Sequence, residues 1–311
     1  MPLLSRTSLR ALAVAALGGA LACSAPAPDP ATIDALFTEA RAHDAEGRHD
    51  DAIAVYRRLL AEDANSFEGH YWIGRAMNLA GQYDEAREHF ARAIDLSTES
   101  NSEQTLRMMA ISWVFASDVD QAAGYYRQVF DARLAAGNAA GASEVANELG
   151  RMYLELGQVD RALEWYRRGF DVAAEEPGRS EAQVDMAAMR WAHAQARIAA
   201  RRGQADMAGE QVAAVQAIVD KGTNTGQGPQ LAYLRGYVAL HLGDAAGAVA
   251  ALEGADHEDP FILLLLAQAH ERTGDTAAAR DYYGRVMAST SHALTAAIAR
   301  PIARERLERA R

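Results

Sequence analysis

One spacing of residues recurs along most of this chain. A small residue is followed seven positions later by a second small residue, usually glycine, then five later by an alanine. An aromatic or aliphatic residue follows after four more positions, as in Gly74, Gly81, Ala86 and Phe90. Six further copies begin at Ala40, Ala110, Gly150, Ala196, Gly236 and Ala267. Such units can bury their apolar residues only by stacking on one another, so the repeat constrains the fold more than any other feature.

The spacing predicts a pair of helices in each copy. Apolar residues before the first small position recur every three to four residues, which is one face of a helix. Glycine at the second position would end this helix, because it adopts a left-handed backbone without steric cost. Small residues at the first and third positions would let two helices approach closely. Ser180 and Gln183 form a capping box that predicts a helix start. We expect an all-α solenoid of about seven helical hairpins.

The repeat resembles the tetratricopeptide repeat (TPR). Tyr83, Ala86, Phe90 and Ala93 occupy the aromatic and alanine positions of that family. The resemblance covers residues 32–288 and implies a right-handed α-solenoid. The third-position alanines lie 31 to 46 residues apart, whereas the period of the family is about 34. The longer intervals predict extended helices or inter-repeat loops. Residues 220–230 are the clearest candidate for such a loop.

The last segment, residues 289–311, is rich in arginine and is expected to form a polar helical cap over the end of the stack. Pro301 should divide this segment into two short helices, or start the second of them at its first turn. We therefore expect the repeats to be followed by a C-terminal capping helix.

The first residues have the pattern of a bacterial lipoprotein. Arg6 and Arg10 precede a run of 11 small or apolar residues at 12–22, which is shorter than the roughly 20 of a membrane-spanning helix. This pattern is typical of a secretory signal peptide. The sequence up to Cys23 resembles a lipobox, which implies cleavage after residue 22 and a lipid on Cys23. Ser24 resembles the signal for transfer to the outer membrane.

The organisation that follows is a signal peptide at 1–22 and a lipidated cysteine with a proline-rich, extended tether at 23–31. We expect a lipoprotein on the periplasmic face of the cell envelope, at the outer membrane. Two alternatives stay open: an ordinary signal peptide without lipid, or an N-terminal segment that remains uncleaved.

Composition and motifs argue against several function classes. The net charge of −11 disfavours non-specific attraction to nucleic acid or to an anionic membrane surface, which leaves the lipid as the expected membrane contact. Cys23 is the only cysteine, so an intramolecular disulfide and a multi-cysteine metal site are excluded. The nine histidines include no i, i+4 pair, and the glycine-rich residues 222–228 lack the ending of a phosphate loop. We expect no cofactor, no metal site and no catalytic site.

A partner-binding groove is the remaining candidate site. In the TPR family the first helix of each hairpin lines a concave groove, and its fifth and ninth positions here are rich in arginine and tyrosine. The predicted groove residues are Arg41, Tyr71, Arg75, Arg107, Asn147, Arg151, His193, Arg197 and Tyr233. Arginine forks bind carboxylates with paired hydrogen bonds, and tyrosines add apolar contact. Acidic residues are expected mainly on the convex side and at turns. Alternatively, the arginines lie over neighbouring helices and the tyrosines pack between repeats.

These features predict a non-enzymatic scaffold or adaptor that binds a peptide or helix of a partner protein. Asn147 is the only residue that matches part of the family's clamp for acidic C-termini, so partners of that class are not implied. One alternative is a lipoprotein that binds a carbohydrate or another small ligand, since helical grooves lined by aromatic residues also take sugars. A second is an α-superhelical glycan-cleaving enzyme. Its only candidate acids are Glu148 and Glu155, and the sequence indicates no desolvating pocket for either.

Overall fold

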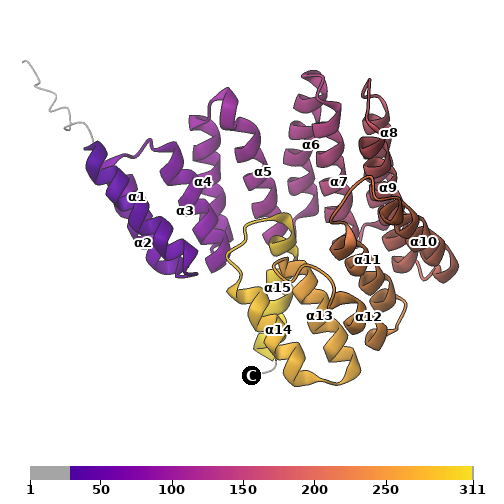
Figure 1. Ribbon diagram of the computed structural model, residues 1–311. Coiled ribbons are helices and arrows are strands. Elements are labelled where there is room, and N and C mark those ends of the chain that lie inside the picture. The colour runs from indigo at the N-terminus through magenta and orange to yellow at the C-terminus, as the bar shows by residue number, and fades with distance from the viewer. Residues whose placement is uncertain (1–28, 310–311) are drawn as a thin grey trace, which may run out of the picture.

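The computed structural model describes residues 29–309, and this range folds into fifteen α-helices without a strand (Figure 1). The helices are α1 (Pro30–Ala45), α2 (His49–Glu62), α3 (Phe67–Ala80), α4 (Tyr83–Leu96), α5 (Glu99–Phe115), α6 (Val119–Ala135), α7 (Ala139–Glu155), α8 (Val159–Ala174), α9 (Glu181–Arg201), α10 (Ala205–Lys221), α11 (Gly228–His241), α12 (Ala245–Leu252), α13 (Pro260–Thr273), α14 (Thr276–Ala288) and α15 (Leu294–Arg309). Consecutive helices pack as pairs from α1/α2 to α13/α14, and the pairs stack side by side. The expected all-α solenoid is confirmed.

The predicted signal peptide and Cys23 lie outside the described residues. Helix α1 begins at Pro30, inside the segment expected to be tether. Asp29 caps it by accepting hydrogen bonds from the Ala31 N–H and the Thr32 hydroxyl, and proline suits the first turn of a helix. Within residues 29–309, none of the helices combines the length and apolar character that a membrane span requires.

The turns within the pairs confirm the spacing of the repeat. The glycine at the second position has a φ between +70° and +96° at Gly47, Gly81, Gly157, Gly203, Gly243 and Gly274. Ser117, at the same position of the third copy, has a φ of 59° and is the one non-glycine residue with positive φ in the described part of the chain. The left-handed conformation there reverses the chain between the two helices of each pair.

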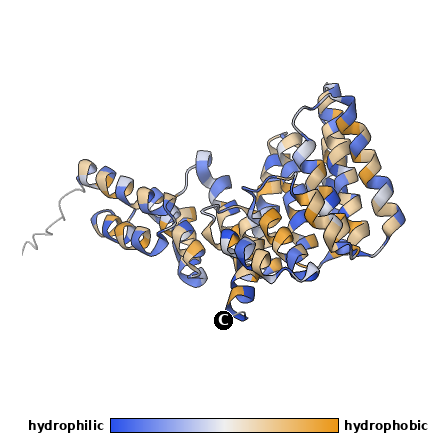
Figure 2. Cartoon of the chain, turned by 60° about the horizontal axis from the view of Figure 1, so that its bottom comes forward, coloured by the Kyte–Doolittle hydropathy of each residue, from blue (hydrophilic) through white to orange (hydrophobic). Residues whose placement is uncertain are grey.

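Extended helices and loops account for the longer middle intervals, as expected. Helix α9 is 21 residues long, whereas α3 and α4 have 14 each. Ser180 and Gln183 form the predicted capping box at the start of α9. The loop expected at 220–230 is shorter than predicted, because α10 continues to Lys221 and α11 begins at Gly228. Figure 2 shows that individual helices carry both hydrophobic and hydrophilic residues, as stacking requires.

Close helix approach within a pair is clearest at Gly150 of α7. A Cβ atom at this position would lie 2.7 Å from the ring of Tyr166 on α8, and Tyr166 is itself buried. The first and fourth positions of the repeat therefore meet across the pair. Gly124, inside α6, differs because an added Cβ would have no atom within 4 Å.

We expect Gly150→Ala to destabilise the chain and Gly124→Ala to stabilise it slightly. Overpacking costs about 1 to 3 kcal/mol, which the better helix propensity of alanine offsets only in part. At Gly124 only the propensity gain of up to about 1 kcal/mol operates. Thermal and urea unfolding of both variants measures the contrast. Equal stability of the two variants would contradict the close approach at Gly150.

The C-terminal segment does more than cover the end of the stack. Helix α15 packs on α13 and α14 and also on α5, far away in the sequence, so the array curls back on itself (Figure 1). All five residues from Ala296 to Arg300 are buried, so neighbours surround this part of the helix.

The predicted break at Pro301 is wrong, because α15 runs through it as a single helix. An internal proline removes a backbone hydrogen bond and costs about 3 kcal/mol. Burial on both sides of the proline, by Ala296–Arg300 before it and Ala303 after it, supplies packing that offsets this cost.

Candidate functional site

In the N-terminal part of the predicted groove, Tyr71 is buried, Arg75 is partly buried and Arg41 is exposed, and all three contact neighbouring side chains. Arg41 of α1 and Arg75 of α3 both lie over the ring of Trp72, with their guanidinium carbons 3.5 Å and 4.6 Å from its centroid. Tyr71 is buried and accepts a hydrogen bond of 2.8 Å from Gln104. These contacts agree with the alternative interpretation of the sequence, in which the arginines lie over neighbouring helices and the tyrosines pack between repeats. Trp72 was missed because the register of the repeat placed Tyr71 and Arg75, rather than Trp72, among the groove-lining positions.

The chain's own C-terminal segment occupies the neighbouring space. His292 is only 7% exposed, and its Nε2 lies 2.9 Å from the side-chain nitrogen of Asn78 on α3. The Asn78 side-chain oxygen accepts a hydrogen bond from the Ser112 hydroxyl of α5. Arg300 of α15 donates to the backbone carbonyl of Leu79 at 2.8 Å. The segment 289–300 thus joins α3 to α5 from the inside.

A pocket of about 410 Å³ remains open among α7, α9 and α11, and we call it the central pocket. Five of the nine predicted groove residues line it: Asn147, Arg151, His193, Arg197 and Tyr233. The sequence register therefore brings together residues from three successive pairs. The pocket also contains Glu148, Met186, Met189 and Arg190, which the groove prediction did not include.

Arg197 forms the back of the central pocket and is only 6% exposed. Its guanidinium donates to the hydroxyl of Tyr166 at 2.7 Å and to that of Tyr233 at 3.4 Å. It also lies 3.7 Å from a carboxylate oxygen of Glu155. Burial raises the pKa of Tyr166 to about 12, so this hydroxyl stays protonated at neutral pH. Arg197 is held rigidly by these partners.

Glu155 is the buried counter-charge of this region. Its side chain is only 4% exposed, and it accepts hydrogen bonds from Arg201 at 3.3 Å and from Tyr237 at 3.2 Å. Burial raises the pKa of the carboxyl, whereas Arg197, Arg151 and Arg201 oppose this shift. Burial also raises the pKa of Glu148, which pairs with Arg107. Glu155 is therefore desolvated, contrary to the expectation from the sequence, whereas the side chain of Glu148 is only partly buried.

The expectation that acidic residues lie mainly on the convex side and at turns is wrong for this part of the groove. Glu148 lines the central pocket, Glu155 lies behind it, and Asp259 is 3.8 Å from Arg151. Burying several arginines without counter-charges would be costly, which explains why carboxylates accompany them. The arginines therefore do not form a uniform ladder of free cations.

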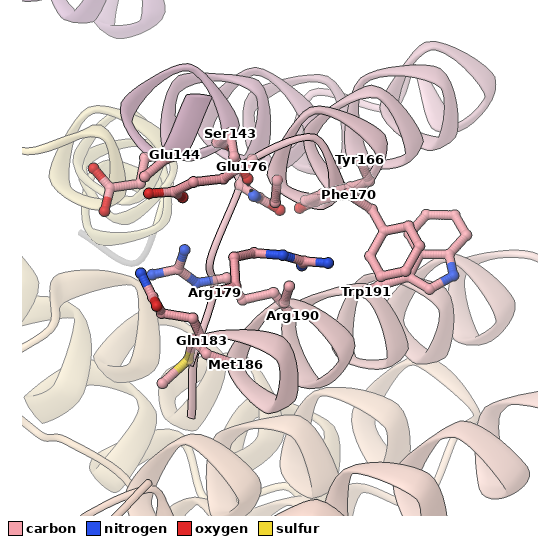
Figure 3. Close-up of a pocket in the computed structure, with 14 residues that line it drawn as sticks. Ser143, Glu144, Tyr166, Phe170, Glu176, Arg179, Gln183, Met186, Arg190 and Trp191 are labelled. Carbon is pink, nitrogen blue, oxygen red and sulfur yellow. Dashed lines mark hydrogen bonds between the residues drawn. The ribbon is translucent and has the colours of Figure 1, made fainter. Parts of the chain in front are cut away.

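A second cavity of about 240 Å³, the rim pocket, adjoins the central pocket and shares Asn147, Tyr166, Met186 and Arg190 with it. Figure 3 shows Arg179 and Arg190 reaching into it, with Glu144 and Glu176 opposite. Trp191 closes one end and stacks on Phe170 with ring centroids 5.8 Å apart. Neither here nor elsewhere in residues 29–309 is a cluster of three or more acidic, histidine or cysteine side chains suited to hold a metal ion.

Comparison with known families decides what kind of repeat this is. Tetratricopeptide-repeat models match residues 37–101, 107–171, 229–253 and 262–289, which together exceed half of the chain. The chain belongs to the tetratricopeptide-repeat family. No match was found among curated proteins.

Solved structures agree with this TPR assignment at the level of the fold. A tetratricopeptide-repeat protein from Parabacteroides merdae superposes with a TM-score of 0.51 at 11% identity, over 89% of this chain and 98% of that one. Aspartyl phosphate phosphatase F from Bacillus subtilis gives a TM-score of 0.57 at 11% identity, over 85% and 71%. At such identities the similarity concerns the fold alone.

The TPR pair outside the matched ranges supplies five of the twelve residues that line the central pocket, more than any other pair. Helices α9 and α10 fall outside the matched ranges, and α9 is the longest helix in residues 29–309. Met186, Met189, Arg190, His193 and Arg197, all on α9, line the central pocket. The extra length of α9 therefore coincides with the open part of the groove.

Two histidines of the TPR array are buried as neutral rings, and this makes stability depend on pH. Burial is the main reason why the pKa values of His193 and His292 lie well below the ordinary value, and neighbouring arginines lower them further. In the unfolded chain each imidazole ring has a pKa of about 6.5. Below that pH the unfolded state binds more protons than the folded state, so stability falls as pH falls.

We expect the melting temperature to drop between pH 7 and pH 5.5, with each ring contributing at most about 1.4 kcal/mol per pH unit below 6.5. The raised pKa values of Glu148 and Glu155 act in the opposite direction and reduce the slope. Melting of His292→Gln should be less pH-dependent than that of the parent. His257→Gln, in the partly exposed loop before α13, is the control and should keep the parent slope. An unchanged slope in His292→Gln would contradict this assignment.

Proposed function

We propose that this TPR protein is a non-enzymatic interaction scaffold that binds a peptide or helix of a partner protein. The observation that carries this proposal is the pair of adjoining pockets lined by residues of α7, α8, α9 and α11. Their lining combines arginines with Trp191 and Tyr233, residue types that dominate binding energy in protein interfaces.

The partner surface in this proposal is smaller than the groove predicted from the sequence. Arg41, Tyr71 and Arg75 are engaged with Trp72 and Gln104, and His292 and α15 occupy the space beside them. Arg107 pairs with Glu148 at the boundary. A partner segment would therefore lie along α9 and end near the N-terminus of α11.

The glycan-cleaving alternative gains little support from the geometry. Glu155 is held by Arg201 and Tyr237, and its near-complete burial leaves it without access to a sugar. Glu148 is tied to Arg107. A general acid needs both a raised pKa and contact with the leaving group, and at Glu155 only the first is present.

Photo-crosslinking tests the scaffold proposal. A photo-reactive amino acid at Met186 or Arg190 should yield a protein adduct in cells, and one at Arg235, on the other side of α11, should not. Arg190→Glu should abolish the Met186 adduct by reversing a charge in the pocket lining. Adducts from Arg235 alone, or from none of the three positions, would contradict the proposed surface.

We further propose that the chain is a lipoprotein on the periplasmic face of the outer membrane, held through Cys23. Support comes from the lipobox-like residues before Cys23, from Ser24 and from the proline-rich segment after it. One lipidated cysteine would hold the array at the membrane while its groove faces the periplasm. Mass spectrometry of the mature protein should find a diacylglycerol-modified Cys23 as the first residue. A mature chain that begins elsewhere, or retains residues 1–22, would refute this.

A further inference from the structure

The central pocket contains polar groups that the fold leaves without partners. His193 is only 9% exposed, and its Nε2 makes no hydrogen bond with the described residues. Nε and one terminal nitrogen of Arg151 are likewise buried without a hydrogen bond. Buried polar groups are nearly always paired, and the exceptions require an explanation. Here the unpartnered groups belong to residues that line one cavity.

The nearest carboxylate does not satisfy Arg151. An oxygen of Asp259 lies 3.8 Å away, beyond hydrogen-bond distance. The other oxygen of Asp259 caps α13 by accepting from the Phe261 N–H at 2.8 Å. Moving Asp259 closer to Arg151 would break this cap, so the carboxylate is held where it is.

Arg190 of α9 provides a second cation in the lining of the pocket. It is exposed and lines both the central and the rim pocket. No hydrogen bond or ion pair to Arg190 occurs within residues 29–309, so its donors are available to a ligand. Met186 and Met189 lie beside it and provide apolar contact.

The pocket has a local excess of positive charge although the chain is acidic. Four arginines and three carboxylates lie in it or contact its lining: Arg107, Arg151, Arg190, Arg197, Glu148, Glu155 and Asp259. The excess of one positive charge contrasts with the net charge of −11 for the whole chain. An anion would therefore be attracted to this pocket rather than to the surrounding surface.

We propose that the central pocket binds a small organic anion, whose carboxylate or phosphate group lies between Arg151, Arg190 and His193 and whose apolar body contacts Met186 and Met189. The volume of about 410 Å³ lies within the range for small-molecule sites. Arg151 and Arg190 would donate to the oxyanion, and His193 Nε2, in the tautomer that carries its hydrogen, would supply a neutral donor. This site does not depend on a protein partner and would make the surface along α9 responsive to a metabolite.

Calorimetric titration of the purified full chain tests the site with four probes at matched ionic strength. These are 3-phenylpropionate, phenyl phosphate, the neutral analogue 3-phenylpropanamide, and inorganic phosphate. We expect saturable binding of at least one organic anion to one site and none of the amide. The first two probes distinguish a carboxylate from a phosphate head group. Binding of none of the probes, of inorganic phosphate alone, or of acid and amide equally would overturn the proposal.

Variants then locate the site. Arg190→Gln should weaken binding of the organic anion about tenfold or more, as loss of a charge-assisted hydrogen bond predicts. Because Arg190 is exposed, this change is not expected to disturb folding. Arg151→Gln should have a similar effect. Arg235→Gln, on α11 outside the pocket, is the matched control and should bind like the parent. Equal affinity in Arg190→Gln and Arg235→Gln would rule out the site, while the crosslinking experiment would still test the partner surface independently.

Discussion

Replacing Arg300 by alanine is expected to destabilise the chain by about 2 to 4 kcal/mol and to loosen α15 from the inside of the array. Arg300 is only 3% exposed and donates at 2.8 Å to the carbonyls of Leu79, Met287 and Ser289. Truncation leaves these three oxygens without the guanidinium and creates a cavity. The loss is less than three full charged hydrogen bonds, because removing a buried charge also relieves its desolvation. That desolvation lowers the pKa of Arg300 to about 10.

Chemical denaturation measures the loss of stability, and amide hydrogen exchange should show faster exchange in α3 and α5, where α15 packs. Arg300→Met separates the loss of the hydrogen bonds from the loss of packing volume, because methionine keeps most of the side chain and lacks only the donors. Arg309→Ala is the control on the same helix, since Arg309 is exposed and, among residues 29–309, pairs only with Glu305 one turn away. It should change stability by less than about 0.5 kcal/mol. If Arg300→Ala unfolds like Arg309→Ala, α15 is not held in the way described.

The repeat register could be predicted from the sequence because its determinants are local. A glycine such as Gly81 can be recognised as a turn residue from its own neighbours, and the 7, 5, 4 spacing fixes which helix faces meet. The docking of α15 on α5 could not be predicted in this way. It accompanies contacts of the C-terminal segment with α3, such as His292 with Asn78, which are 214 residues apart and belong to no periodic pattern.

In the candidate site too, some features could be predicted from the sequence and others could not. Counting back from each turn placed Arg151, His193, Arg197 and Tyr233 on one surface, and the structure brings them into one pocket. Their counter-charges were missed because each ion pair joins residues of different repeats. Arg107 and Glu148 are 41 residues apart, and Arg201 and Glu155 are 46 apart. Periodicity predicts which face a residue occupies, but not whether its charge is already paired.

The buried charge cluster around Glu155 yields the other large expected effect. Glu155→Ala should destabilise the chain by about 3 to 5 kcal/mol, because it leaves Arg197 buried without its carboxylate and removes the acceptor of Arg201 and Tyr237. Denaturation with urea measures the change. Glu164→Ala, at an exposed position on α8, is the control and should be nearly neutral.

A double variant shows whether the cost arises from the unpaired charge or from lost packing. Glu155→Leu combined with Arg197→Met replaces the ion pair by apolar side chains of similar length, and such replacements are often neutral or stabilising in buried sites. We expect the double variant to be more stable than Glu155→Leu alone. The coupling free energy between the two substitutions should be about 1 to 3 kcal/mol. If the two substitutions instead add independently, Glu155 does not serve as the counter-charge of Arg197.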